Sequence, residues 1–106
     1  MLSRHKRLRA SEVDTVLSRG KSIRGGHLSM KFLQNKEPFR LAVIVPKSLA
    51  RKATLRNKLR RAAYDSIGTS LPPSSKGHAL FFVRSIPMTP LRTIFKEEAT
   101  ALLTKI

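Results

Sequence analysis

Two short runs of almost entirely apolar residues constrain the fold of this chain more than any other feature. They span residues 41–45 and 79–83, and β-branched and aromatic side chains make up much of them. A strand that is apolar on both of its sides is typical of a sheet covered on both faces. We therefore expect a buried sheet in which residues 39–45 form a central strand.

A third segment, residues 23–33, has the alternation of a strand with one buried face. Leu28, Met30 and Phe32 alternate with Ser29 and Lys31, and a pair of glycines lies earlier in the segment. The polar residues 34–38 then predict a turn. Because this connection is short, the strands on either side of it are expected to pair antiparallel.

Three further segments carry apolar residues at helical spacing. The first helix is expected to open at Ser11 as the N-cap, with Asp14 at the third helical position, and to close at Gly20. The main helix spans about residues 51–67, and the last opens at residue 89 or 90. The predicted buried stripes are Val13, Val16 and Leu17; Leu55, Leu59, Ala62, Ala63, Ser66 and Ile67; and Ile94, Phe95, Ala99, Leu102 and Leu103.

This order of segments predicts an α+β fold, built as a two-layer α/β sandwich. A chain of 106 residues is long enough for one core and too short for two, so residues 1–106 are expected to form a single domain. No apolar run is long enough for a transmembrane helix. The absence of cysteine excludes a disulfide framework and fits a reducing cytoplasm.

The charge of the chain is its strongest functional signal. Lysine and arginine number 22 against 6 acidic residues, which gives a formal net charge of +16. Solubility of a small domain needs a net charge of only about 2–8, so a nucleic acid or, less commonly, an anionic membrane surface is the expected partner. Residues 1–9 are expected to form a flexible basic arm until RNA neutralises it.

The segment from residue 47 to residue 61 concentrates these cations. A helix that presents arginine at positions i and i+4 can meet several phosphates, and each guanidinium can bind a phosphate through two hydrogen bonds. A solvated basic face is the alternative, but this helix has only Asp65 for pairing along its length. The predicted RNA-binding residues are Lys47, Arg51, Lys52, Arg56, Asn57, Lys58, Arg60 and Arg61.

No catalytic or metal-binding arrangement stands out elsewhere. His5, His27 and His78 lack the spacing of metal ligands, and the six carboxylates form no nuclease-like pair. Glu97 and Glu98 are expected to cap a helix or to pair with lysine. The sequence therefore predicts RNA contacts without catalytic machinery of its own.

Residues 56–61, which read R-N-K-L-R-R, resemble the R-N-R signature of the bacterial ribonuclease P protein component. Residues 7–12, 19–22, 43–47 and 81–84 are also similar to that family and occur in the same order, so the resemblance covers nearly the whole chain. It implies a fold like domain 2 of ribosomal protein S5, with the order α-β-β-β-α-β-α, and a cytoplasmic location.

The resemblance also implies a function. In this family the RNA subunit is the ribozyme and uses Mg²⁺, while the protein helps to bind that RNA and the 5′ leader of precursor tRNA as the leader is removed endonucleolytically. Residues 56–61 would then contact the ribonuclease P RNA near the cleavage site, and no metal site on the protein is expected. We expect one protein per RNA and no membrane partner.

The chain departs from the family pattern at two places. Tyr64 stands where the family motif ends in arginine, and it is expected to stack on a base or to donate to a phosphate. The cleft for the leader would be lined by Val13, Leu17, Ser29 and Lys31, which replace the aromatic residues of the family. Stacking on an aromatic is worth roughly 1–3 kcal/mol per base, and Lys31 is expected to supply charge instead.

A structural ribosomal protein or a general RNA chaperone of similar fold is the alternative reading. Cleavage of precursor tRNA at its mature 5′ end, promoted by this protein together with ribonuclease P RNA at low Mg²⁺, would separate the two. An autonomous protein nuclease would cut without the RNA, and the sequence lacks residues for that chemistry.

Overall fold

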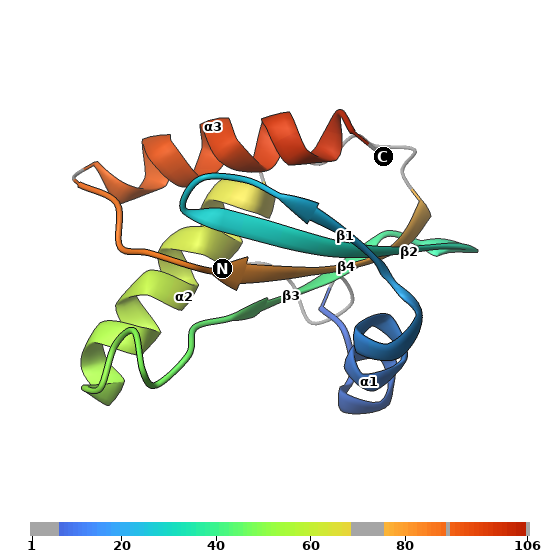
Figure 1. The fold of residues 1–106 in the computed structure, drawn as a ribbon, viewed down its shortest axis with the longest axis horizontal. Coiled ribbons are helices and arrows are strands. Elements are labelled where there is room, and N and C mark those ends of the chain that lie inside the picture. Colours follow the sequence, from blue (N-terminus) through green and yellow to red (C-terminus); the bar gives the residue numbers. More distant parts are fainter. Residues whose placement is uncertain (1–6, 69–75, 89, 106) are drawn as a thin grey trace.

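The computed structural model describes residues 7–68, 76–88 and 90–105 of the chain. Within these ranges it has the α+β architecture and the element order that the sequence predicts (Figure 1). The elements are α1 (Ala10–Arg19), β1 (Lys21–Arg24), β2 (Leu28–Pro38), β3 (Arg40–Ile44), α2 (Ala53–Gly68), β4 (Lys76–Val83) and α3 (Leu91–Leu103).

The four strands form one sheet in the order β1-β2-β4-β3. Strand β4 pairs antiparallel with β2 and parallel with β3, so it separates the two strands that were predicted to pair with each other. That prediction is wrong because residues 34–38 continue β2 instead of turning back. They contain no glycine, which the tight turns of two-residue hairpins favour.

Strand β3 is consequently an edge strand, although its sequence predicted a central one. Its outer edge is covered by two hydrogen bonds. Leu8 N–H donates to the Leu41 carbonyl at 2.9 Å, and Val43 N–H donates to the Tyr64 hydroxyl at 3.1 Å. An edge that is covered in this way can be apolar without exposing a template for aggregation. Residues 7 and 8 of the predicted flexible arm therefore lie against the sheet, and residues 1–6 are outside the described ranges.

The predicted strand 23–33 is divided by a hairpin turn at residues 25–27, so it forms both β1 and β2. A Cβ atom on Gly25 would lie 2.4 Å from the Leu28 carbonyl oxygen, which leaves room only for glycine. Glu98 of α3 accepts hydrogen bonds from the backbone N–H groups of His27 and Leu28. Glu98 thus holds the turn of the hairpin, whereas the sequence predicted that it caps a helix or pairs with lysine.

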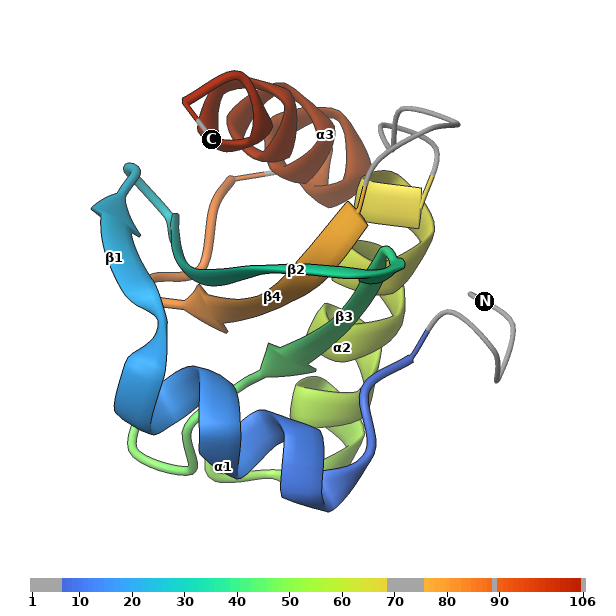
Figure 2. The same cartoon turned by 90° about the vertical axis from the view of Figure 1, so that its right-hand side faces the viewer.

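The two faces of the sheet pack against different helices (Figure 2). Helices α2 and α3 cover one face, where Phe81 and Phe95 are fully buried. Helix α1 lies on the other face, where Val16 packs against Ala42 and Leu80. The predicted stripes of α2 and α3 are confirmed, with only Leu55 and Ile94 partly buried. In α1, Val16 is buried as predicted, but Val13 is partly buried and Leu17 is exposed.

Helix α1 begins two residues earlier than predicted. Arg9 occupies the N-cap position, and its backbone N–H donates to the Glu12 carboxylate at 2.8 Å. Glu12 stands at the third helical position, where a longer side chain reaches back to the cap more easily than that of Asp14 would. Gly20 closes the helix as predicted, through a hydrogen bond from its N–H to the Val16 carbonyl. None of the helices in the described ranges is long and apolar enough to span a membrane.

Candidate RNA interface

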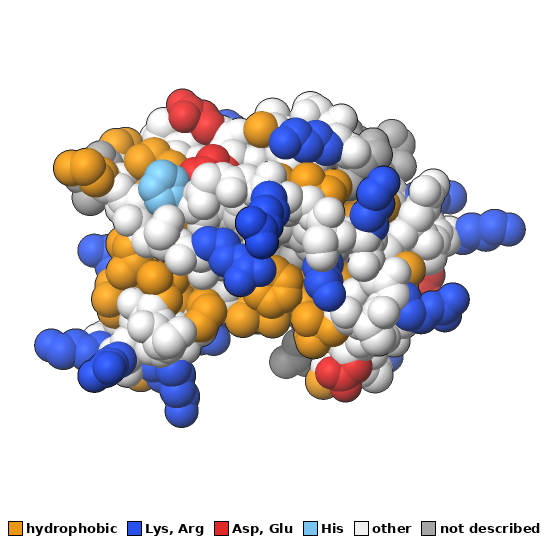
Figure 3. Space-filling model, viewed as in Figure 1, with side chains coloured by type: hydrophobic (Ala, Val, Ile, Leu, Met, Phe, Trp, Pro, Cys, Tyr) orange, Lys and Arg blue, Asp and Glu red, His pale blue; other side chains and the backbone are white. Residues whose placement is uncertain are grey.

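The first part of the candidate site is the outer face of α2. Arg60 and Arg61 are exposed there, as predicted, because the buried stripe beneath them fixes the rotation of the helix. Figure 3 shows Lys and Arg side chains gathered at the lower left, where α2 begins. The predicted RNA-binding residues that are exposed on α2 and on the segment before it are Lys47, Arg51, Lys52, Asn57, Lys58, Arg60 and Arg61.

Arg56 differs from these residues because its guanidinium is partly buried. It donates to the Ala50 carbonyl at 3.0 Å and to the Arg51 carbonyl at 2.8 Å. These bonds fasten the segment before α2 to the helix and so position Arg51. One turn further along the helix, Arg60 donates to the side-chain oxygen of Asn57, which ties these two exposed side chains together.

A groove of about 370 Å³ continues this basic face from α2 onto α3. Asn57, Lys58 and Arg61 line it from α2, and Arg92 lines it from α3. Arg92 donates to Asp65 at 2.8 Å, and this hydrogen bond holds the pKa of the Asp65 carboxyl below its ordinary value. The sequence reasoning missed Arg92, because only the packing of α3 against α2 brings it to the predicted face.

Tyr64 lies in the core rather than on the RNA-facing surface. Its side chain is only 8% exposed, and its hydroxyl accepts the hydrogen bond from Val43 described above. A ring in this position has no free face for a base, so the prediction that Tyr64 stacks on RNA is wrong. Tyr64 instead belongs to the same core cluster as Leu59.

The second part of the candidate site is a cleft of about 360 Å³ on the face of the sheet that carries α1. Leu17, Ser29 and Lys31 line it, as predicted. Val13 does not, because it packs beside Val16 against the sheet. The lining residues that the sequence reasoning did not assign to the cleft are Ser22, Ile23, Arg24, Met30, Phe82 and Arg84.

The polar residues of this cleft are tied to its walls. Ser29 is only 6% exposed, so it does not face outward as predicted, and its hydroxyl accepts a hydrogen bond from Arg84 Nε at 2.8 Å. Lys31 Nζ donates to the Leu17 carbonyl at 2.8 Å, at the end of α1. A cation suits this place, because the last carbonyls of a helix lack partners and carry partial negative charge.

Phe82 is in contact with Arg84 in the cleft. The Arg84 guanidinium carbon lies 5.1 Å from the centre of the Phe82 ring, within the range of a cation–π contact. The alternation of strand β4 turns Phe81 to the main core and Phe82 to the cleft. That alternation is visible in the sequence, but the apolar run alone does not show that α1 stops short of Phe82.

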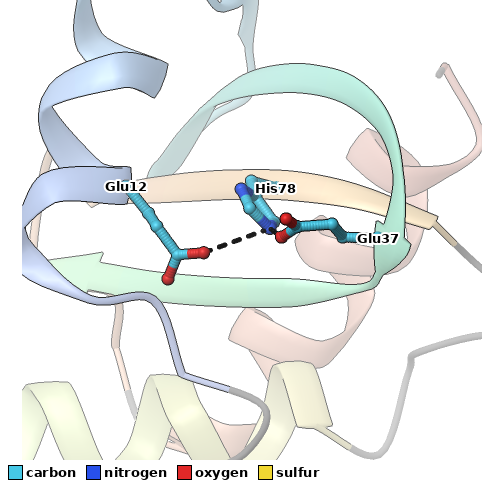
Figure 4. A group of neighbouring side chains, drawn as sticks. All are labelled: Glu12, Glu37 and His78. Atoms are coloured by element: carbon cyan, nitrogen blue, oxygen red, sulfur yellow. Dashed lines mark ion pairs between the residues drawn. The ribbon is translucent and has the colours of Figure 1, made fainter.

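A polar cluster near the first turn of α1, at the opposite end of β4 from the cleft, joins α1 to the sheet (Figure 4). His78 Nε2 lies 3.0 Å from a Glu37 oxygen and 3.6 Å from a Glu12 oxygen, and these groups have the types and spacing of metal ligands. Arg40 also contacts the carboxylates, since it donates to Glu12 at 3.1 and 3.2 Å and lies 3.7 Å from Glu37. Together these residues form an ion-pair network.

Glu12 is the centre of this network. Burial by itself would raise the pKa of the Glu12 carboxyl, but the hydrogen bond from the Arg9 backbone and the charges of Arg40 and His78 outweigh it, and the pKa is held below its ordinary value. Glu12 stays ionised near neutral pH and links the first turn of α1 to both β3 and β4.

Comparisons with known proteins identify relatives of this chain and of its fold. A family model described as Ribonuclease P matches residues 2–106. The fold is similar to the RNase P protein of Staphylococcus aureus, with a TM-score of 0.78 at 21% identity over 94% of each chain. It is also similar to the RNase P protein of Thermotoga maritima, with a TM-score of 0.68 at 24% identity over 94% of this chain and 96% of that one. Among curated protein sequences, none matches this chain.

Proposed function

This chain belongs to the ribonuclease P protein family, and from that premise we propose that it is the protein subunit of a ribonuclease P. In this proposal it binds the ribonuclease P RNA and precursor tRNA, and it assists endonucleolytic removal of the 5′ leader. The hydrolytic chemistry and its Mg²⁺ ions belong to the RNA subunit. The residues of this chain bind and orient RNA, with one protein for each RNA.

The observation that carries the proposal is the outward, nearly acid-free face of α2. Its cations stand on a helix whose opposite side is fully buried at Leu59, Ala63 and Ile67, so their spacing is rigid. Side chains held in this way lose little conformational freedom when they bind, and each phosphate they neutralise releases counterions. This face is the proposed contact with the ribonuclease P RNA.

The cleft beside α1 is the proposed contact with the leader. It combines Phe82 with the cations Arg24, Lys31 and Arg84, which are the groups that recognise unpaired nucleotides through their bases and phosphates. The cleft and α2 lie on opposite faces of one sheet, because Phe82 projects to the side of α1 and Leu59 packs in the core on the other side. One protein could therefore hold both RNAs at a set separation.

Reconstitution tests the proposal. The protein mixed with ribonuclease P RNA at low Mg²⁺ is expected to promote cleavage of precursor tRNA at the mature 5′ end. The double variant Arg60→Ala, Arg61→Ala should lose most of this stimulation. The control Lys96→Ala, Lys105→Ala removes the same charge from exposed positions on and just after α3 and should retain it.

Two results would contradict the proposal. Stimulation of unrelated RNA folding without site-specific cleavage would favour a ribosomal protein or an RNA chaperone. Cleavage of the precursor by the protein without ribonuclease P RNA would instead show an autonomous nuclease.

A further inference from the structure

The ion-pair network at the first turn of α1 contains a buried nitrogen atom that lacks a hydrogen bond. His78 is only 5% exposed, and its ring points toward the carboxylates of Glu12 and Glu37 (Figure 4). Among the residues that the structure describes, none makes a hydrogen bond with His78 Nε2, although a Glu37 oxygen lies 3.0 Å away and a Glu12 oxygen 3.6 Å away. Buried polar atoms normally have a partner, so this nitrogen suits a ligand other than a hydrogen-bond acceptor.

The three side chains have the chemistry of a site for a divalent transition-metal ion. Imidazole and carboxylate groups together bind Zn²⁺ and related ions, whereas Mg²⁺ prefers oxygen ligands alone. The three ligand atoms lie within 4.8 Å of one another. At the observed separations, an ion about 2.1 Å from each ligand atom would make an angle of roughly 90° between His78 and Glu37 and roughly 120° between His78 and Glu12. Both angles occur in four- and five-coordinate sites.

Arg40 orients the carboxylates and still leaves them able to bind an ion. It brings one positive charge to two carboxylates, so the network keeps one negative charge while His78 is neutral. A carboxylate has about four lone-pair sites, so Glu12 can accept from Arg40 and coordinate an ion at the same time. Hydrogen bonds of this kind commonly hold metal-binding carboxylates in place. The Glu37 side chain is 54% exposed, which gives an ion a path from solvent.

We propose that Glu12, Glu37 and His78 bind one divalent transition-metal ion of the zinc class. The ligands come from α1, β2 and β4, so the bound ion joins the first turn of the helix to two strands of the sheet. Water completes its coordination on the exposed side. The sequence reasoning found no such site because the three residues are far apart in the chain and only the fold brings them together. The site lies apart from both proposed RNA contacts.

Equilibrium dialysis of the purified protein against zinc chloride, near neutral pH and without RNA, measures the site directly. One equivalent of Zn²⁺ is expected to bind. The melting temperature should rise by about 10 °C or more when free zinc is a hundredfold above its dissociation constant, because an ion that binds only the folded protein stabilises it. The same concentration of Mg²⁺ should produce neither effect.

Two variants each remove one ligand. His78→Ala should weaken Zn²⁺ binding by about tenfold or more, since even the loss of a group that only supports a metal ligand costs about that much. Glu37→Gln should weaken it as well, and because Glu37 is exposed this variant keeps the packing of the core. His27→Ala is the matched control. His27 also contacts a carboxylate, that of Glu98, but it lies outside the cluster, so this variant should bind zinc as the wild type does.

Three results would overturn the site. The first is a wild-type protein that neither binds one equivalent of zinc nor melts at a higher temperature in its presence. The second is zinc binding that Glu37→Gln and His78→Ala leave unchanged. The third is zinc binding that is lost in His27→Ala, which would place the ion at the hairpin. Because RNA is absent from these measurements, none of these results bears on the proposed function, and a failure to stimulate cleavage would leave the metal site standing.

Discussion

At the scale of single residues, Tyr64 shows how one side chain can exchange a surface role for a structural one. The family motif that residues 56–61 resemble ends in arginine at this position. Here a buried ring carries its hydroxyl to the open edge of β3, where it accepts the Val43 N–H. Helix α2 therefore has one cation fewer than the family motif, but the Val43 N–H at the edge of β3 has a hydrogen-bond acceptor.

Tyr64→Phe is expected to lower the free energy of unfolding by about 1–3 kcal/mol, because a buried N–H group is left without its acceptor. Urea denaturation measures this change. The affinity for RNA and its dependence on salt should stay as in the wild type. Unchanged stability with weaker RNA binding would show instead that the hydroxyl reaches RNA.

At the scale of secondary-structure elements, α3 controls the position of the β1–β2 hairpin through Glu98. The Glu98 carboxylate accepts from the backbone of His27 and Leu28 and also contacts His27 Nδ1. Burial would raise the pKa of Glu98, but these hydrogen bonds outweigh it and hold the pKa below the ordinary value of 4.5. Since β1 carries Arg24, this bond also positions one wall of the cleft.

The lowered pKa of Glu98 predicts a dependence of stability on pH. A carboxyl with a depressed pKa in the folded state stabilises the fold above its ordinary pKa, and this contribution is lost as the pH falls through the folded-state pKa. Wild-type stability should therefore decline as the pH drops below about 4.5. Glu98→Gln should be less stable at neutral pH and should decline less steeply in acid.

The adjacent Glu97→Gln is the control for this measurement, since Glu97 is exposed on the same helix. It should behave like the wild type in urea titrations across the same pH range. Equal pH profiles for Glu98→Gln and the wild type would mean that Glu98 does not hold the hairpin as an anion.

Because α3 packs beside α2, Arg92 of α3 is expected to bind RNA together with the cations of α2. Arg92→Ala should weaken binding to ribonuclease P RNA and lower the slope of log affinity against log salt by about one unit, as expected for one phosphate contact. Arg61→Ala should do the same. Lys96→Ala is the control, because Lys96 is an exposed cation on α3 that does not line the groove. A slope that changes for Arg61→Ala alone would limit the face to α2.

At the scale of the whole molecule, features that depend on residues close together in the sequence could be predicted, and features that depend on residues far apart in the sequence could not. The burial stripes of α2 and α3 repeat within a few residues, so they could be read directly, and they place Arg60 and Arg61 outside. The position of β4 between β2 and β3 depends on pairing with residues far away in the chain. For the same reason Phe82, Arg84 and Arg92 could not be assigned to a site before the helices were placed.

The net charge of +16 predicts that the isolated protein is stabilised by salt. Like charges repel most strongly in the compact state, and raising KCl from about 0.1 M to about 1 M shortens the screening length from about 10 Å to about 3 Å. The melting temperature should rise by about 4–8 °C for each kcal/mol recovered.

A charge variant provides the control for this salt effect. Lys21→Glu with Lys105→Glu lowers the net charge by four units at exposed positions, and the effect of KCl on the melting temperature should become smaller. A melting temperature that falls with KCl in the wild type would mean that favourable ion pairs, such as those of Arg40, outweigh the general repulsion.

The position of β4 also has a consequence for the order in which the protein can assemble during translation. Strands β2 and β3 are made first but have no direct pairing, because the place between them belongs to residues 76–83. A nascent chain that ends before those residues leaves facing backbone groups of both strands unpaired. Native structure should therefore arise late in synthesis, in one cooperative step when the last strand enters, and earlier fragments would depend on chaperones or rapid elongation to avoid pairing wrongly.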